Sequence, residues 1–194
     1  MVMTFDRGRQ STLMFLAAMK ETLPIPQMSI RTLVSHGRYS RLPFSKALGS
    51  GDRDAIERAL DLTDMTELAG CMLSKLSGGQ RQRAFLAMVI AQDPLYFLLD
   101  EVTSYMDIEH QRKTMEIVTR LAKSGKGILM TSHDLPLSFT VSDKIYIFEE
   151  GHAALQESPG ELLEKKEQVR DILGISIGQS SSAEALYTYE LQKG

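Results

Sequence analysis

A glycine pair at the start of a long apolar-rich stretch is the first feature of this sequence that could do chemistry. Leu76–Gln80 reads LSGGQ, and the spacing that follows it predicts a helix. A helix N-terminus presents free backbone N–H groups and the positive end of its dipole. Gly78 and Gly79 carry no side chains that block close approach, and the Ser77 hydroxyl adds a donor. The turn therefore predicts a phosphate cradle, with an ordinary serine-capped helix as the alternative.

Two carboxylates follow an apolar run further along the chain. Tyr96–Leu99 predicts a buried parallel strand, and Asp100 and Glu101 come directly after it. A carboxylate at a strand end can hold Mg²⁺, directly or through water. Its neighbour can orient or deprotonate a water that attacks a γ-phosphate. Two acids that begin a solvated loop are the alternative reading.

A histidine stands just past the end of a second apolar run. Lys126–Thr131 predicts another buried strand, and His133 follows it where an imidazole could hydrogen-bond a phosphate. A structural histidine is the alternative, and Asp107 by itself indicates a turn or helix cap. Because ligands bind at the carboxyl ends of parallel strands, Asp100-Glu101 and Ser132-His133 are expected to share one edge of a sheet.

The elements that must position these groups alternate between strand and helix. Helical spacing covers Ser29–Gly37, Asp52–Thr63 with Asp52 as N-cap, Gln80–Gln92, Glu109–Lys123, Leu135–Val141 and Glu161–Leu173. Lys144–Phe148 predicts a third strand, and Ile175–Leu191 predicts a hairpin around Ser180–Ser182. Strands alternating with helices are typical of a parallel α/β sheet.

Composition excludes several function classes. The 194 residues are 43% hydrophobic, which is enough for a real core, and the net charge of −3 gives no case for nucleic-acid binding. No apolar run is long enough to span a bilayer. The single Cys71 cannot form an internal disulfide, and the four histidines are too scattered to suggest a metal cluster.

In combination, these segments resemble the ATP-binding subunits of ABC transporters. LSGGQ matches the signature sequence of that family, and LYFLLDE at Leu95–Glu101 resembles its Walker B strand. Ser104–Asp107 resembles the D-loop, and His133 resembles the switch histidine. Leu23–Tyr39 and Thr103–Gln111 are further similar to the branch that imports iron-siderophore complexes, haem or cobalamin.

The resemblance implies an α/β fold, a P-loop NTPase-like ABC ATPase domain with a parallel sheet and a helical subdomain. It assigns 1–20 to a leader or remnant of the core, 21–75 to the Q-loop region and helical subdomain, 76–151 to the signature helix and Walker B/H-loop core, and 152–194 to C-terminal helices and a tail. The first strands and the P-loop G-x-x-x-x-G-K-[ST] are expected to be missing through N-terminal truncation. Gly8–Thr12 looks like the end of a P-loop, but too few residues separate it from Glu21 for the helix and strands that should follow.

The same resemblance implies a role for each site residue, with ATP and Mg²⁺ as cofactors. Glu101 would be the water-positioning base, His133 the γ-phosphate sensor and Asp100 the metal ligand. The turn of Leu76–Gln80 would contact ATP held by a second subunit in a head-to-tail dimer. Nucleotide contacts are implied for Ser77, Gly78, Gly79, Gln80, Asp107 and Glu21, the last of which stands where the family has glutamine.

The implied function is an ATPase subunit that energises import of iron-siderophore-type chelates. Its partners would be membrane permease subunits, a second ATPase subunit and, indirectly, a substrate-binding protein, at the cytoplasmic face of the cell membrane. A catalytically incompetent truncated fragment, or a half-module that lends its signature turn to an intact partner, is the alternative. A DNA-repair ATPase head would need coiled-coil insertions that this sequence lacks. Loss of core strands would expose strand edges and lower solubility.

Overall fold

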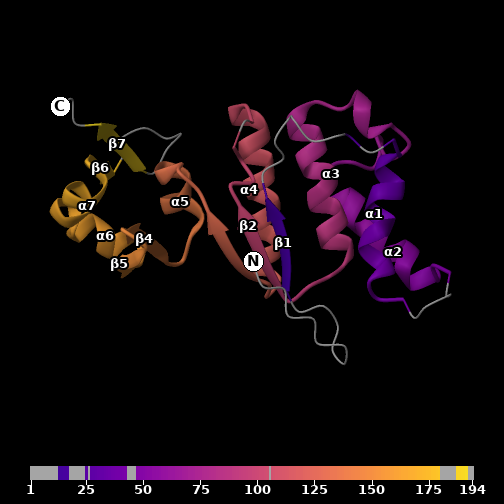
Figure 1. The fold of residues 1–194 in the computed structure, drawn as a ribbon, viewed down its shortest axis with the longest axis horizontal. Helices are drawn as coiled ribbons and strands as arrows, with labels where there is room; N and C mark the ends of the chain where they lie inside the picture. Colours follow the sequence, from indigo (N-terminus) through magenta and orange to yellow (C-terminus); the bar gives the residue numbers. More distant parts are fainter. Residues whose placement is uncertain are drawn as a thin grey trace. The chain divides into compact units, whose positions relative to one another are not determined.

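The chain divides into two compact units, Met1–Ser132 and His133–Gly194, in a computed structural model of its 194 residues (Figure 1). The structure describes residues 13–17, 25, 27–42, 47–104, 106–179 and 187–191. Among these residues, no helix has the length and apolar character needed to cross a bilayer.

A parallel sheet of three strands organises the first unit. Its order is β1 (Leu13–Ala17), β2 (Tyr96–Asp100) and β3 (Gly127–Thr131). The register pairs Ala17 with Asp100 and Asp100 with Thr131, so the strands end at the same level. Phe97 and Leu99 are buried along one face of β2, as expected for a strand inside a core. The two predicted strands are therefore confirmed, and β1 adds a third that the sequence pattern did not indicate.

Four of the first unit's helices were predicted from sequence. These are α1 (Ile30–Tyr39), α2 (Ser50–Leu62), α3 (Gly78–Ala91) and α4 (Ile108–Lys123), and a 3₁₀ turn η1 (Leu73–Lys75) precedes α3. The assignment of Asp52 as N-cap is wrong. Gly49 caps α2, and Asp52 stands three residues later, where its carboxylate accepts a hydrogen bond from the Gly49 N–H at 3.0 Å.

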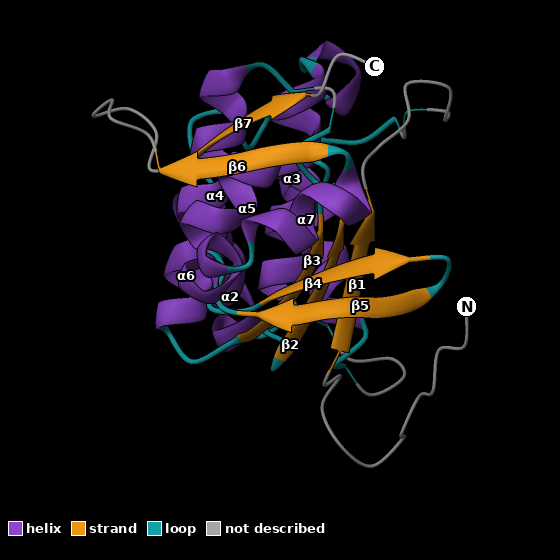
Figure 2. Cartoon of the chain, turned by 90° about the vertical axis from the view of Figure 1, so that its left-hand side faces the viewer, coloured by secondary structure: helices purple, strands orange, loops and turns teal. Residues whose placement is uncertain are grey.

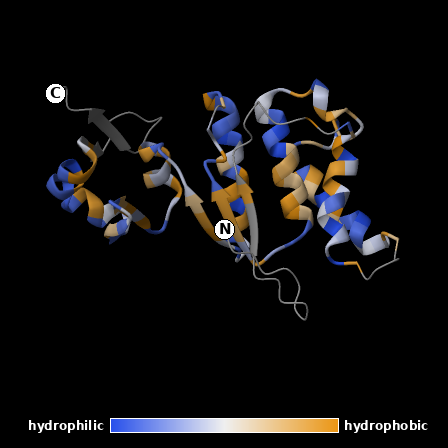
Figure 3. Cartoon of the chain, viewed as in Figure 1, coloured by the Kyte–Doolittle hydropathy of each residue, from blue (hydrophilic) through white to orange (hydrophobic). Residues whose placement is uncertain are grey.

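Helices α1, α2 and α3 pack around a common apolar core, visible in Figure 3 where α1 and α3 meet. Its fully buried members include Ile30, Val34, Leu60, Met65 and Leu73. The backbones of α1 and α3 approach so closely at Gly37 that an added Cβ would overlap the Met88 carbonyl oxygen. Only glycine fits at this position without a shift of one helix.

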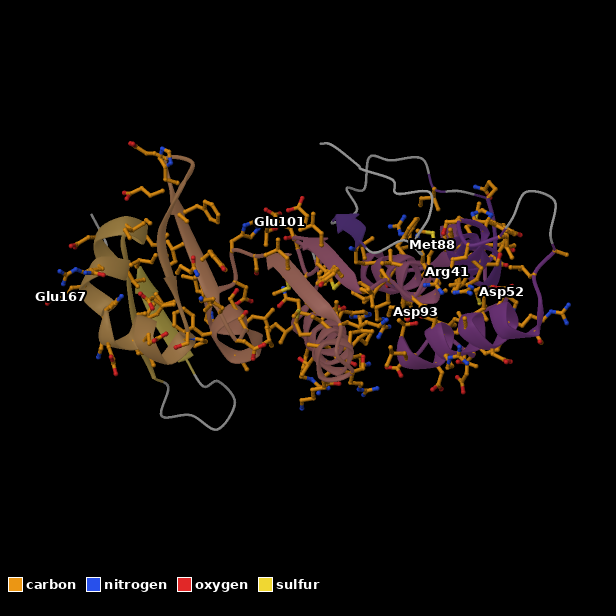
Figure 4. All side chains as sticks on the ribbon, turned by 90° about the horizontal axis from the view of Figure 1, so that it is seen from below. Arg41, Asp52, Met88, Asp93, Glu101 and Glu167 are labelled. Carbon is orange, nitrogen blue, oxygen red and sulfur yellow. The ribbon has the colours of Figure 1, made fainter. Side chains whose placement is uncertain are left out.

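Charged side chains close the end of this helical layer. Arg38 donates to Asp52 at 2.9 Å and to the Ala91 carbonyl at 2.7 Å, which ties α1 to both α2 and α3. Arg41 donates to the Asp93 carbonyl at 3.0 Å, and Lys126 pairs with the Asp93 carboxylate at 2.6 Å. Figure 4 labels Arg41, Asp52 and Asp93 on this part of the molecule.

The second unit contains short helices and two hairpins, seen most clearly in Figure 2. Its elements are α5 (Leu135–Val141), β4 (Ile145–Glu149), β5 (His152–Glu157), α6 (Pro159–Glu164), α7 (Lys166–Leu173), β6 (Ile175–Gln179) and β7 (Tyr187–Leu191). Their apolar core includes Phe139, Ile147, Leu162 and Val169. The antiparallel pairing of β6 with β7 confirms the predicted hairpin, whose Ser180–Ser182 turn lies outside the described residues.

Two predictions for this unit need correction. The strand at Lys144–Phe148 was expected to continue the parallel alternation, but β4 pairs antiparallel with β5. The cause is local, because Glu150 and Gly151 both have positive φ, 46° and 83°, and such a pair favours a tight hairpin turn. The single helix expected over Glu161–Leu173 is two helices that meet at Lys165.

Candidate functional site

The turn at Ser77–Gln80 forms a closed hydrogen-bonded cap at the start of α3. The Ser77 hydroxyl accepts from the Gln80 N–H at 3.2 Å, and the Gln80 side-chain oxygen accepts from the Ser77 N–H at 3.0 Å. This reciprocal arrangement is a capping box, which offsets the poor helix propensity of the two glycines. The cap fixes the backbone of the turn and leaves Ser77 and Gly78 exposed.

The two glycines of the turn have different surroundings. A Cβ placed on Gly78 would meet no atom within 4 Å, so the space beside it is open. A Cβ on Gly79 would lie 2.6 Å from Cδ2 of His110, a residue of α4. Sequence reasoning assigned both glycines to the approach of a phosphate. The structure leaves that space at Gly78, whereas at Gly79 an imidazole fills it.

A buried cation lies one turn further along α3. Arg83 is 6% exposed, and within the described part of the chain its Nε has no hydrogen-bond partner. Arg83 is four residues after Gly79, and both are buried, so Arg83 lies on the covered face of α3 and not on the open side at Gly78.

Asp100 and Glu101 are connected through Thr131. The Thr131 hydroxyl donates to Asp100 Oδ1 at 2.6 Å and accepts from the Glu101 N–H at 3.2 Å. The Ser104 hydroxyl donates to Glu101 Oε2 at 3.2 Å. Glu101 has φ of 50°, a left-handed conformation that a glutamate rarely adopts. The strand ends therefore hold both carboxylates in fixed positions at one edge of the sheet.

Sequence reasoning missed Thr131, although a signal for it was present. Thr131 is the last residue of its predicted strand, and parallel register places it beside Asp100. The atoms around Asp100 and Glu101 that could ligate a metal are carboxylate and hydroxyl oxygens, the kind that Mg²⁺ prefers. No cluster of three or more His, Cys, Asp or Glu side chains that could hold a metal occurs among the described residues. An Mg²⁺ with one or two protein ligands, whose shell phosphate and water complete, would be compatible with the Asp100 carboxylate and its neighbours.

Asp107 caps α4 and holds His110. Its carboxylate accepts from the His110 backbone N–H at 2.9 Å, and His110 Nδ1 lies 2.8 Å from Oδ1 and 2.9 Å from Oδ2. The His110 N–H first, and then its ring, lower the pKa of Asp107 below its usual value. Ile108, between them, is 84% exposed. Since the His110 ring also lies beside Gly79, it links the start of α4 to the start of α3.

The predicted site residues fall into separate groups. Asp100 and Glu101 form one cluster with Thr131 and Ser104, whereas the neighbours expected from sequence were Ser132 and His133. Ser77, Gly78, Gly79 and Gln80 form the α3 turn, which His110 links to Asp107. His133 is the first residue of the second unit, and its predicted role is untested. Glu21 lies outside the described residues.

Known proteins resemble this chain in sequence. The family described as "ABC transporter" matches residues 9–104. A petrobactin import ATP-binding protein of Bacillus anthracis is 36% identical over 146 residues, covering 75% of this chain and 53% of that protein. A ferric enterobactin transport ATP-binding protein of Escherichia coli (strain K12) is 34% identical over 149 residues, covering 76% and 55%. The chain thus spans little more than half the length of these relatives.

Solved structures share the fold. An inward-facing metal-chelate type ABC transporter superposes with a TM-score of 0.79 at 21% identity, over 93% of this chain and 73% of that one. The ATP-binding cassette MJ0796, as a post-hydrolysis dimer bound to ADP and Pi, gives 0.64 at 21% identity, over 78% and 64%. These likenesses support the α/β ATPase fold class expected from sequence.

Proposed function

Because the chain belongs to the ATP-binding subunits of ABC transporters, we propose that it supplies the Walker B and signature parts of an ATPase that energises import of an iron-siderophore-type chelate. One observation carries this proposal. The Thr131 hydroxyl holds Asp100 and the Glu101 backbone side by side at the carboxyl edge of a parallel sheet. The names of the relatives, which import petrobactin and ferric enterobactin, support the class of cargo.

Asp100 and Glu101 have different roles in ATP hydrolysis. Asp100, oriented by the Thr131 hydroxyl, presents a carboxylate for Mg²⁺. The metal, when bound, neutralises charge on the phosphate oxygens. The Glu101 carboxylate, aligned by the Ser104 hydroxyl, orients a water toward the γ-phosphorus and accepts its proton. On the family pattern alone, His133 is assigned to sensing the γ-phosphate. On the same basis, Glu21 is assigned to contacting the nucleotide.

The Ser77–Gln80 turn acts on a different nucleotide. In a head-to-tail pair, the Gly78 amide and the Ser77 hydroxyl donate to the γ-phosphate of ATP held by the second subunit. The open space at Gly78 supports this role. The helical layer of α1 and α2 is assigned to the permease subunits at the inner face of the membrane, and a substrate-binding protein would act through that permease.

Ferric-siderophore uptake by cells that carry the complete transport system tests this function. Glu101→Gln removes the base and should abolish uptake of radiolabelled iron, whereas Glu109→Gln, an exposed acid on α4, should leave it intact. Uptake that survives Glu101→Gln at normal protein levels would contradict the proposal.

A thermal-shift assay with Mg-ATP separates the alternatives. Stabilisation of the purified chain alone indicates that it binds nucleotide itself. Stabilisation only in a mixture with an intact homologous ATPase indicates a half-module that lends its turn in trans. No stabilisation in either sample would argue against any nucleotide contact.

A further inference from the structure

The contact between Gly79 and His110 joins two helix starts that are far apart in sequence. Gly79 is the second residue of α3, and His110 lies in the first turn of α4. The imidazole occupies the space that a side chain at residue 79 would need, with Cδ2 and Cγ at 2.6 and 2.8 Å from an ideal Cβ. Gly78, its neighbour, has no atom within 4 Å of the same position. The two glycines are thus required for different reasons.

The Asp107 carboxylate fixes the orientation of this imidazole. His110 Nδ1 lies 2.8 and 2.9 Å from its two oxygens, and Asp107 also accepts the His110 backbone N–H. The His110 side chain is 22% exposed, so most of the ring is covered. A ring held by a carboxylate at Nδ1 and lying against a glycine at Cδ2 and Cγ has little freedom to turn. Any displacement of the α4 start is therefore passed to the α3 turn.

We infer that His110 is a positioning residue that sets the Ser77–Gln80 turn relative to Asp107, so that the open amide edge at Gly78 meets the phosphate of a second subunit in a defined orientation. The inference rests on the proposed function for the role of the turn. The contact itself does not depend on that function. Gly79 serves this internal contact, and Gly78 alone keeps the approach for phosphate open.

A double-mutant cycle tests the contact without nucleotide. Gly79→Ala should lower the melting midpoint by about 4 °C, because the methyl group displaces the imidazole. In the His110→Ala background the same change should raise the midpoint, since alanine favours a helix more than glycine does. Gly78→Ala is the matched control and should give the same small shift in both backgrounds. Effects of Gly79→Ala that are equal in the two backgrounds would overturn the inference.

ATP hydrolysis by the assembled transporter tests the positioning role. His110→Ala should lower kcat at least tenfold with little change in KM for ATP, because orientation for the transition state is lost while ground-state binding by the other subunit remains. His110→Asn, whose amide nitrogen can replace Nδ1 toward Asp107, should recover part of kcat. Glu116→Gln, further along α4, is the control.

The two proposals fail in distinguishable ways. If Glu101→Gln and His110→Ala both leave hydrolysis unchanged, the proposed function is wrong. If Glu101→Gln abolishes hydrolysis while His110→Ala matches the wild type, the positioning role alone is wrong. A purely structural role for His110 predicts less folded protein with normal kcat per folded molecule, and that outcome would also overturn the inference.

Discussion

A single hydroxyl contacts both acidic site residues. The Thr131 hydroxyl donates to Asp100 and accepts from the Glu101 backbone N–H. Removing this hydroxyl would therefore remove one hydrogen bond from each residue. Sequence reasoning identified the two acids from their place after an apolar run. It missed Thr131, because a threonine at a strand end is common and stands out only when the register beside Asp100 is considered.

Thr131→Val tests this dependence. Valine keeps the shape of threonine and removes the hydroxyl's hydrogen bond to Asp100, while the Glu101 N–H keeps the residue 131 carbonyl as acceptor, so the free energy of unfolding should fall by about 1 kcal/mol. Urea denaturation of the purified chain measures the change. Thr131→Ser keeps the hydroxyl and should stay near the wild type, and a valine variant as stable as the wild type would show that the hydroxyl is not needed.

Asp52 makes stability depend on pH in the acid range. The Gly49 N–H, and then the Arg38 guanidinium, lower the pKa of its carboxyl. A lowered folded-state pKa stabilises the protein above the unfolded value of about 3.9, and this contribution is lost as the pH falls through the folded-state pKa. Melting curves from pH 7 to pH 3 should therefore show a smaller acid-induced loss for Asp52→Asn than for the wild type. Parallel curves for the two proteins would contradict this origin.

The helices were the most predictable elements, because their apolar spacing and their caps agree. Ser29, Ser77 and Asp107 each cap a helix whose start was predicted to within two residues. Asp52 was misplaced because an acid at the third helical position and an N-cap acid look alike in sequence. The partner of β4 could not be read from its own residues, since a strand pattern does not encode its neighbour. The Glu150-Gly151 turn was the available signal.

Gly37 tests the packing of α1 on α3. In Gly37→Ala the added methyl group meets the Met88 backbone, which cannot move away as a side chain can, so we expect a loss of about 1–3 kcal/mol. Gly51→Ala, in α2, is the matched control because its Cβ meets nothing within 4 Å. It should stabilise by up to about 1 kcal/mol through helix propensity. Chemical denaturation of the two variants should give opposite signs, and equal effects would refute close packing at Gly37.

At the scale of the whole molecule, large apolar side chains remain exposed on the sheet of the first unit. Leu129 on β3 is 60% exposed, and Tyr96 on β2 is 54% exposed. Leu95, the residue before Tyr96, is 58% exposed. Exposed apolar surface of this kind favours association in water. The low solubility expected from the sequence stays a prediction. If it holds, we expect the surface of Leu95, Tyr96 and Leu129 to be its cause.

Leu129→Lys should weaken concentration-dependent self-association. The side chain is exposed, so the free energy of unfolding should change by less than about 0.5 kcal/mol. Sedimentation velocity over a range of protein concentrations measures the effect. Leu129→Met keeps the surface apolar and should associate like the wild type. If Leu129→Lys leaves self-association unchanged, the surface responsible for association does not include Leu129.

The backbone of Glu101 is strained at the end of β2. Its φ of 50° suits glycine or asparagine far better than glutamate. The left-handed conformation at Glu101 therefore carries a stability cost that glycine or asparagine would relieve, and a carboxylate held there is strained before any ligand binds.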